Sequence, residues 1–135
     1  MDKYEELLKT AQELIRKRYQ KEGHHSVVAA ALRTTSGKVY SAINVGTYQP
    51  SIATCAEIIA IGMAHVAEEG MEIESIVAVR DEGAYVISPC GKCREYIADY
   101  GPNAVVLMPK QQGSDEFIPT PIGELIPGKY RKCVC

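Results

Sequence analysis

Two short stretches, T-C-A-E at residues 54–57 and S-P-C-G-K-C-R at residues 88–94, carry three of the five cysteines in this chain. Each stretch opens a segment with helical character, so the fold must bring two distant helix starts together if the cysteines share a site. Positions i and i+3 lie on one side of a helix, so Cys90 and Cys93 can both reach one ion. A third thiolate from Cys55 would leave one position of a tetrahedral zinc ion open, as catalytic zinc sites require.

Glu57 follows Cys55 by two residues at the same helix start. A carboxylate beside a water at a zinc site can take a proton from that water and return it to a leaving amine. Zinc-dependent base deaminases carry an H-x-E…P-C-x-x-C pattern in which the glutamate moves protons and does not bind the metal. Here the pattern is C-A-E…P-C-G-K-C, with cysteine in place of histidine. It predicts Glu57 as the catalytic acid and base.

The charge of such a site has to be balanced. Three thiolates around Zn²⁺ leave one net negative charge, which helix N-termini offset only in part. Arg94, and less directly Lys92, are the nearby cations expected to compensate the rest. Backbone groups around Ala56 and Ser88 are expected to bind the amide edge of a planar base.

Other interpretations of the cysteines stay open. A C-x-x-C pair in a small protein also occurs as a redox pair or as half of a structural zinc site. A metal that only holds two helices together would need a fourth protein ligand. His24, His25 and the tail cysteines Cys133 and Cys135 are the candidates for that ligand. This non-enzymatic zinc-stabilised module is the alternative to catalysis.

Length and composition narrow the class of protein. The 135 residues fit one domain over 1–135, and a hydrophobic fraction of 46% is ordinary for a globular core. The net charge of −2 argues against a polynucleotide partner, and no apolar run is long enough for a membrane span. An odd number of cysteines and an N-terminus without a secretory apolar core favour a reducing compartment. We therefore expect a soluble cytoplasmic protein that acts on a small molecule.

Hydrophobic periodicity predicts the order of helices and strands. A hairpin followed by strands that alternate with helices indicates an α/β fold, a three-layer α-β-α domain with a mixed five-stranded sheet. The acidic pair Glu68–Glu69 is expected to be a solvated helix end. The predicted helices cover 3–20, 55–69, 90–100 and 122–126, and the predicted strands cover 27–35, 38–45, 75–80, 85–88 and 104–108.

From about residue 23 to residue 130 the chain resembles the cytidine deaminase family. The resemblance rests on AALRTTSGKVYSAINV, ATCAEIIAIGMA, SIVAVR, ISPCGKCREYIADYGP and IGELIPGKY. The chain is particularly similar to the blasticidin S deaminase branch, through HHSVVAAALRT, CAEIIAIG and ELIPGKY. The resemblance implies a cytidine deaminase-like fold and a homotetramer whose active sites are completed by neighbouring subunits. It also implies one Zn²⁺ per subunit on Cys55, Cys90 and Cys93, with Glu57 as the proton carrier.

Two departures from the family pattern bear on the substrate. Asn44 falls on the first residue of the family's N-x-E element, whose Asn and Glu hold the ribose 3′-hydroxyl, but Gly46 stands in place of the Glu. Ile58 replaces an Arg that commonly follows the catalytic Glu, which leaves more of the charge compensation to Arg94. We expect hydrolytic deamination at C4 of a cytosine ring, giving the uracil product and ammonia. Cytidine or deoxycytidine is favoured by the family, whereas a larger aminoacyl nucleoside such as blasticidin S is favoured by the branch and by Gly46.

Overall fold

A computed structural model describes residues 2–19 and 27–131 of the chain, so His24, His25, Cys133 and Cys135 lie outside the described residues. The helices are α1 (Lys3–Arg18), α2 (Ala56–Ala67) and α3 (Gly91–Tyr100), with short 3₁₀ turns η1 (Pro50–Ile52) and η2 (Ile122–Glu124). The strands are β1 (Val28–Thr34), β2 (Val39–Ile43), β3 (Ile73–Arg80), β4 (Tyr85–Ile87), β5 (Val105–Pro109) and β6 (Phe117–Pro121).

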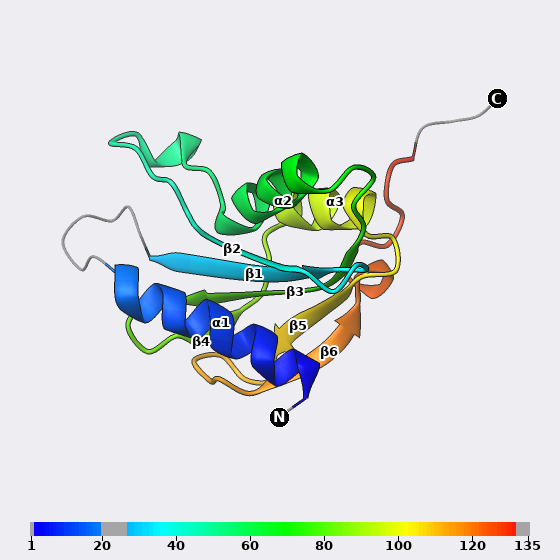
Figure 1. Cartoon of the computed structure of the whole chain (residues 1–135). Helices are drawn as coiled ribbons and strands as arrows, with labels where there is room; N and C mark the ends of the chain where they lie inside the picture. Colours follow the sequence, from blue (N-terminus) through cyan, green and yellow to red (C-terminus); the bar gives the residue numbers. More distant parts are fainter. Residues whose placement is uncertain (1, 20–26, 132–135) are drawn as a thin grey trace.

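One mixed sheet organises these elements. Its strand order is β2-β1-β3-β5-β6, and β4 pairs with the carboxyl end of β3. The β3–β5 pair is parallel, whereas the other strand pairs are antiparallel. Helix α1 covers one face of the sheet and helices α2 and α3 cover the other (Figure 1). The predicted three-layer α/β architecture with a mixed sheet is therefore confirmed.

The number of strands corrects the prediction. The sheet has six strands within the described residues, where the sequence predicts five, because β6 contains Pro119 and Pro121 and does not resemble a regular strand. Proline cannot donate to a β-ladder and is therefore confined to edge strands and strand ends. The two prolines are two residues apart, so both nitrogens can face the free edge while the other side pairs with β5. The predicted helix over 122–126 is only the 3₁₀ turn η2.

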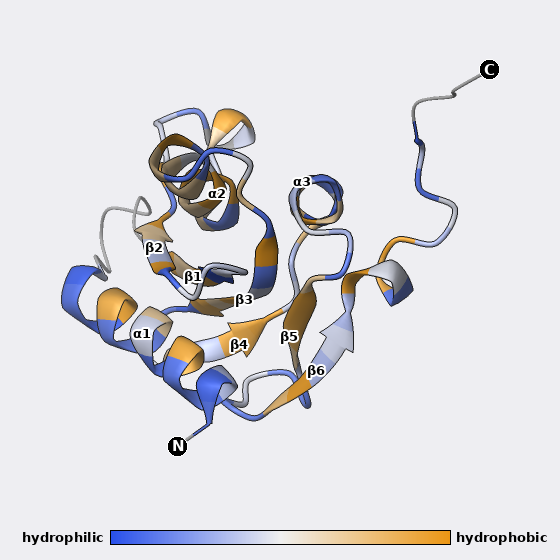
Figure 2. Cartoon of the chain, turned by 45° about the vertical axis from the view of Figure 1, so that its right-hand side comes forward, coloured by the Kyte–Doolittle hydropathy of each residue, from blue (hydrophilic) through white to orange (hydrophobic). Residues whose placement is uncertain are grey.

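The central strand β3 separates two apolar layers. Ile76 belongs to the core beneath α2 and α3, whereas Val77 and Val79 pack with Leu7 and Ile15 of α1. All five side chains are buried. Burial on both faces is what the continuous apolar run SIVAVR predicts. Helix α1 alternates between hydrophilic and hydrophobic residues, whereas α2 is hydrophobic along most of its length (Figure 2).

Helix α3 ends against β3 through a glycine. Gly101 is the C-cap of α3, and a Cβ atom built there would lie 2.7 Å from the carbonyl oxygen of Ile73 and 2.8 Å from its Cβ. Only a residue without a side chain allows this close approach. The contact brings the carboxyl end of α3 down onto the sheet.

The end of α2 is tied to the β1–β2 hairpin by one carboxylate. Glu68 accepts hydrogen bonds from Tyr40 Oη at 2.6 Å, Ser36 Oγ at 2.8 Å and Thr34 Oγ1 at 3.0 Å. The hydrogen bond from Tyr40, followed by that from Ser36, lowers the pKa of the Glu68 carboxyl. Of the acidic pair expected to be solvated, Glu69 is exposed, whereas Glu68 is half-buried.

Replacement of Tyr40 by Phe should therefore have a pH-dependent effect on stability. The pKa of Glu68 is lower in the folded protein, so its hydrogen bonds stabilise the fold above the unfolded pKa of about 4.3. That stabilisation is lost as the pH falls through the folded pKa. We expect Tyr40→Phe to lower the urea midpoint at pH 7 and the difference from wild type to shrink below pH 4. Tyr96→Phe, on the exposed side of α3, is the control, and a pH-independent difference for Tyr40→Phe would contradict this account.

Candidate metal centre and active site

The three motif cysteines meet at the starts of two helices. Cys55 is the N-cap of α2, Cys90 is the N-cap of α3, and Cys93 lies buried in the first turn of α3. Their sulfur atoms all lie within 4.8 Å of one another, and those of Cys55 and Cys90 are 3.9 Å apart. Two thiolates on a tetrahedral zinc ion, each about 2.3 Å from the metal, are separated by about 3.8 Å. The donor set therefore fits zinc both in chemistry and in spacing.

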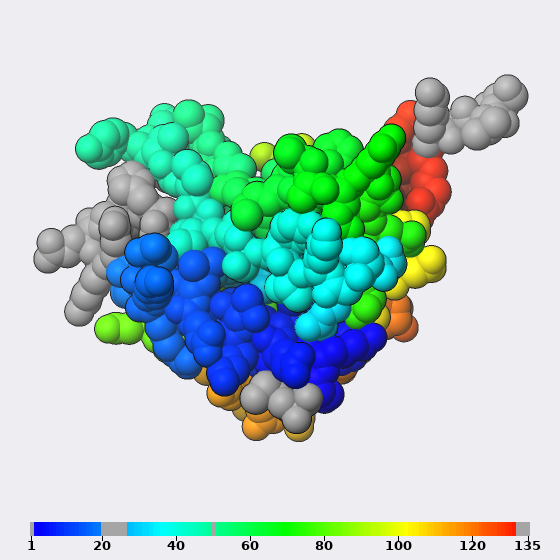
Figure 3. Space-filling view, in the orientation of Figure 1, coloured from blue at the N-terminus to red at the C-terminus, as the bar shows by residue number. Residues whose placement is uncertain are grey.

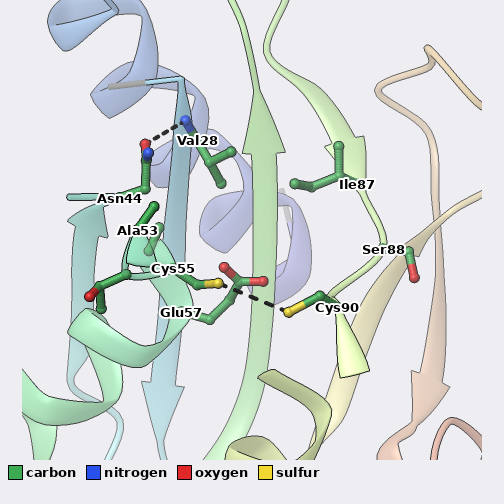
Figure 4. Close-up of a pocket in the computed structure, with 10 residues that line it drawn as sticks. Val28, Asn44, Ala53, Cys55, Glu57, Ile87, Ser88 and Cys90 are labelled. Atoms are coloured by element: carbon green, nitrogen blue, oxygen red, sulfur yellow. Dashed lines mark hydrogen bonds between the residues drawn. The ribbon is translucent and has the colours of Figure 1, made fainter. Parts of the chain in front are cut away.

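Local structure on both sides holds this arrangement. The segment before α2 is closed by a pair of backbone hydrogen bonds between Val45 and Thr54, at 3.0 and 2.8 Å, immediately ahead of Cys55. On the other side, β4 leads through Ser88 and Pro89 directly into Cys90. Figure 4 shows the sulfur atoms of Cys55 and Cys90 facing each other, with Glu57 beside them.

The surroundings of the three thiols disfavour the thiolate form of two of them in the absence of a cation. Burial raises the pKa of Cys55, and it raises the pKa of Cys93 strongly, with a further rise from the Glu57 carboxylate. Burial also acts to raise the pKa of Cys90, but hydrogen bonds from the backbone N–H and thiol of Cys93 outweigh it and lower that pKa. The start of α3 thus stabilises one thiolate, as its position at a helix N-terminus predicts. A divalent cation would stabilise the other two, because a coordinated thiol loses its proton.

Glu57 is the carboxylate placed at this centre. It projects from the first turn of α2 and is only 4% exposed. Burial raises the pKa of the Glu57 carboxyl, and hydrogen bonds from its own backbone N–H and from the Cys93 thiol offset this only in part. A carboxyl group with a raised pKa is suited to accept a proton and to release it again.

A cavity of about 200 Å³ opens beside the cysteines. It brings the predicted Glu57, Asn44, Ala56 and Ser88 together at one place. The apolar residues of the cavity wall, Val28, Ala53 and Ile87, were not predicted from the sequence, because no chemical pattern distinguishes such side chains from core residues. The lining residues are Val28, Asn44, Ala53, Thr54, Cys55, Ala56, Glu57, Ile87, Ser88 and Cys90 (Figure 4).

Asn44 is held in a fixed orientation at the cavity wall. Its Oδ1 accepts hydrogen bonds from the backbone N–H groups of Val27 and Val28, both at 3.0 Å. An amide oxygen used in this way assigns the orientation of the whole amide group. The NH₂ group of Asn44 is then the part that can donate to a ligand, and the role of Asn44 in substrate binding stays a prediction.

Arg94 makes contacts that its sequence position does not reveal. Its Nε donates to the carbonyl oxygen of Pro89 at 3.0 Å, its Nη1 to that of Leu125 at 2.9 Å, and its Nη2 to Ser88 Oγ at 2.8 Å. Each guanidinium nitrogen thus donates to an oxygen atom. The positive charge still follows Cys93 directly in the chain, so charge compensation by Arg94 stays a prediction.

A second cavity, of about 360 Å³, shares Ile87 and Ser88 with the first. It lies between β4 and the segment that follows β5. Two of its residues, Arg80 and Tyr85, both contact Asp81, at 3.6 Å and 2.9 Å. The remaining lining residues are Val86, Pro109, Gln112 and Gly113.

Comparisons with known proteins agree with this geometry. The family model of the cytidine and deoxycytidylate deaminase zinc-binding region matches residues 1–109. The chain is 40% identical to the blasticidin-S deaminase of Bacillus cereus over 134 residues, covering 94% of this chain and 91% of that protein. It is 30% identical to the cytidine deaminase of Sporosarcina psychrophila over 106 residues, covering 78% and 75% of the two chains.

The fold is similar to solved structures as well. A cytidine deaminase from Burkholderia pseudomallei matches with a TM-score of 0.76 at 29% identity, covering 96% of this chain and 100% of the other. The cytidine deaminase from Bacillus anthracis matches with a TM-score of 0.76 at 25% identity, over 96% and 90% of the chains. With its cysteine motifs joined at the starts of α2 and α3, the chain belongs to the zinc-binding family of cytidine and deoxycytidylate deaminases.

Proposed function

We propose that this protein hydrolyses the C4–amine bond of a cytosine ring in a small-molecule nucleoside, giving the uracil product and ammonia. The observation that carries the proposal is the position of Glu57, buried at the wall of the same cavity that Cys55 and Cys90 line. A Zn²⁺ ion held by these two cysteines and Cys93 would supply the Lewis acidity that makes water nucleophilic near neutral pH. Family membership and the two deaminase relatives support the same reaction.

The residues of the cavity have separate proposed roles in proton transfer and in binding of the ring. Glu57 accepts a proton from the water that adds to C4 and delivers a proton to ring N3. It then carries the proton of the new hydroxyl group to N4, and the C4–N4 bond breaks as ammonia leaves. Val28 and Ile87 line opposite sides of the cavity and offer apolar surfaces to the faces of the ring (Figure 4). Backbone groups at Ala56 and Ser88 are proposed to bind its polar edge.

Replacement of Glu57 by Gln tests the mechanism. The amide cannot carry protons, so we expect kcat to fall by about 10²- to 10⁴-fold. Turnover is measured with cytidine, deoxycytidine and blasticidin S, and zinc is quantified in the same samples. Zinc content should stay at the wild-type level, because Glu57 is not one of the proposed ligands. Glu69→Gln, an exposed acid just after α2, is the matched control, and near-normal turnover by Glu57→Gln on all three substrates would refute the proposal.

The non-enzymatic zinc module is the alternative to catalysis, and the match to named deaminases counts against it. It requires a closed site with a fourth protein ligand, drawn from His24, His25 or the tail cysteines. A wild-type protein that binds zinc but turns over none of the three substrates would favour it. Zinc retained after removal of Cys133 and Cys135 would count against the tail version.

Within the deamination reaction we place an aminoacyl nucleoside such as blasticidin S slightly ahead of cytidine and deoxycytidine. Identity of 40% to a blasticidin-S deaminase supports this order. Gly46 in place of the family's sugar-binding Glu removes a carboxylate two residues after Asn44. The second cavity shares Ile87 and Ser88 with the first, and we propose that it gives room for a larger substrate than cytidine.

The Gly46→Glu variant tests this preference. A carboxylate at this position restores the family's N-x-E element, and it should favour a plain ribose over a bulky extension. We expect the ratio of kcat/KM for cytidine to that for blasticidin S to rise about tenfold or more, equivalent to about 1.4 kcal/mol. Thr47→Glu places the same charge one residue further along and is the control. A wild-type protein that strongly prefers cytidine would contradict the proposed substrate.

We further propose a cytoplasmic homotetramer. Support comes from exposed apolar side chains, Met63 (46%) and Val66 (88%) on α2 and Val45 (58%) and Ile52 (65%) on the segment before it. That segment, 45–54, stands out from the body of the molecule (Figure 3). Apolar patches of this kind mark protein interfaces. Among residues 2–19 and 27–131, no helix has the length and apolar character of a membrane span. The net charge of −2 supports the absence of a polynucleotide partner.

Sedimentation velocity tests the assembly. We expect wild type to sediment as four chains and Val66→Glu to shift to smaller species, because a buried unpaired carboxylate destabilises an apolar interface. Ile118→Glu, at an exposed position of β6 on the opposite edge of the sheet, should keep the wild-type mass. A monomeric wild-type protein at micromolar concentration would rule out the tetramer.

A further inference from the structure

Arg94 joins three points of the chain that the sequence keeps apart. Its guanidinium donates to Ser88 Oγ and to the Pro89 carbonyl oxygen in the connection from β4 to α3, and also to the Leu125 carbonyl oxygen just after η2. A guanidinium presents its N–H donors in a rigid planar fork and can fix several acceptors at once. A lysine ammonium at this position would keep the charge but lose that geometry.

The contact with Ser88 determines what this hydroxyl can do. Because Nη2 of Arg94 donates to Ser88 Oγ at 2.8 Å, the oxygen acts as the acceptor in that bond. The proton of the hydroxyl is then available for a second hydrogen bond, in which Ser88 is the donor. A bond from a cationic group also polarises the hydroxyl and strengthens it as a donor. Ser88 is one of the two residues that line both cavities, so a ligand in either cavity lies next to it.

The contact with Pro89 acts on the backbone beside the same hydroxyl. Pro89 lies between Ser88 and Cys90, and its carbonyl oxygen is held at 3.0 Å from Arg94 Nε. The third contact, with Leu125, ties this connection to the carboxyl-terminal part of the chain. Loss of the Arg94 guanidinium would remove the hydrogen bonds that hold the Ser88 hydroxyl and the neighbouring Pro89 carbonyl group.

We propose that Arg94 is a positioning residue that acts through Ser88, holding its hydroxyl as a hydrogen-bond donor to an acceptor on the bound nucleoside. The proposal rests on the proposed function, since it takes the nucleoside to bind in the cavity beside Glu57. It differs from charge compensation, which needs only a positive charge at residue 94. It also differs from a purely structural role in docking the segment around Leu125.

A double-mutant cycle of Arg94→Lys and Ser88→Ala separates these roles. Lys keeps the charge, and Ala removes the hydroxyl. We expect each single variant to raise KM about tenfold. The KM of the double variant should not exceed the higher of the two single-variant values, because both substitutions remove the same contact. Zinc content should stay at the wild-type level. Calorimetric binding of the deaminated product gives a readout that does not depend on turnover, and it should weaken in parallel with KM.

Two further variants complete the test. Lys129 is 5% exposed in its side chain and forms ion pairs with Glu95 at 3.0 Å and Asp99 at 2.8 Å, so it joins the segment after η2 to α3 through residues other than Ser88. We expect Lys129→Met to lower the melting temperature and leave KM unchanged. Ser88→Thr keeps a hydroxyl and should bind product better than Ser88→Ala, which also tests the proposal if Arg94→Lys does not fold.

Several results would overturn the inference. A wild-type KM in Arg94→Lys would leave charge as the sole role, and additive effects in the cycle would show that Arg94 does not act through Ser88. A rise in KM for Lys129→Met equal to that for Arg94→Lys would assign the effect to docking of the chain end. A wild-type KM in Ser88→Ala would exclude the proposed hydrogen bond from Ser88 to the nucleoside. Failure of the proposed function would instead appear as a wild-type protein that turns over no cytosine nucleoside.

Discussion

The close approach of the first turns of α2 and α3 is the constraint on which the rest of the structure depends. Helix α2 joins β2 to β3 and α3 joins β4 to β5, and both lie on the same face of the sheet. Their N-termini therefore meet, and the sulfur atoms of Cys55 and Cys90 come within 3.9 Å. The cavity forms at this junction, with one wall from β1 and one from β4. Any change that separates the two helix starts disrupts the cysteine cluster, the burial of Glu57 and the cavity together.

The electrostatics of the junction follow from its burial. Three thiols and one carboxyl are gathered where desolvation disfavours their charged forms, and only Cys90 has its pKa lowered, by donors at the start of α3. Such a cluster is poorly suited to exist without a cation and well suited to hold one. Arg94 follows Cys93 directly in the chain. Its guanidinium is committed to three oxygen atoms, which makes it a brace for the connection that leads into Cys90.

The proposed chemistry and the proposed choice of substrate draw on different parts of the molecule. The cysteines and Glu57, which are proposed to act on the base, lie at the starts of the two helices. Asn44 and Ser88 line the same cavity, Gly46 follows Asn44 by two residues, and these positions are proposed to contact the rest of the substrate. These outer positions come from strand ends and loops, which tolerate change better than a packed helix start. In the proposed function a single reaction can therefore serve nucleosides with different attached groups, and Gly46 is the departure from the family pattern that bears on the sugar.

Sequence alone determined the features that depend on short spacing. The C-x-E and C-x-x-C patterns place their side chains within one helical turn, and the run SIVAVR requires burial on both faces, so the zinc-site hypothesis and the central strand were predictable. Strand β6 was missed because edge pairing compensates for two prolines that local propensity rejects. The partners of Arg94 and of Glu68 could not be predicted either, since Leu125 lies 31 residues from Arg94 and Tyr40 lies 28 from Glu68. Helix geometry sets contacts between near neighbours, whereas only packing of the whole chain decides which distant donors and acceptors meet.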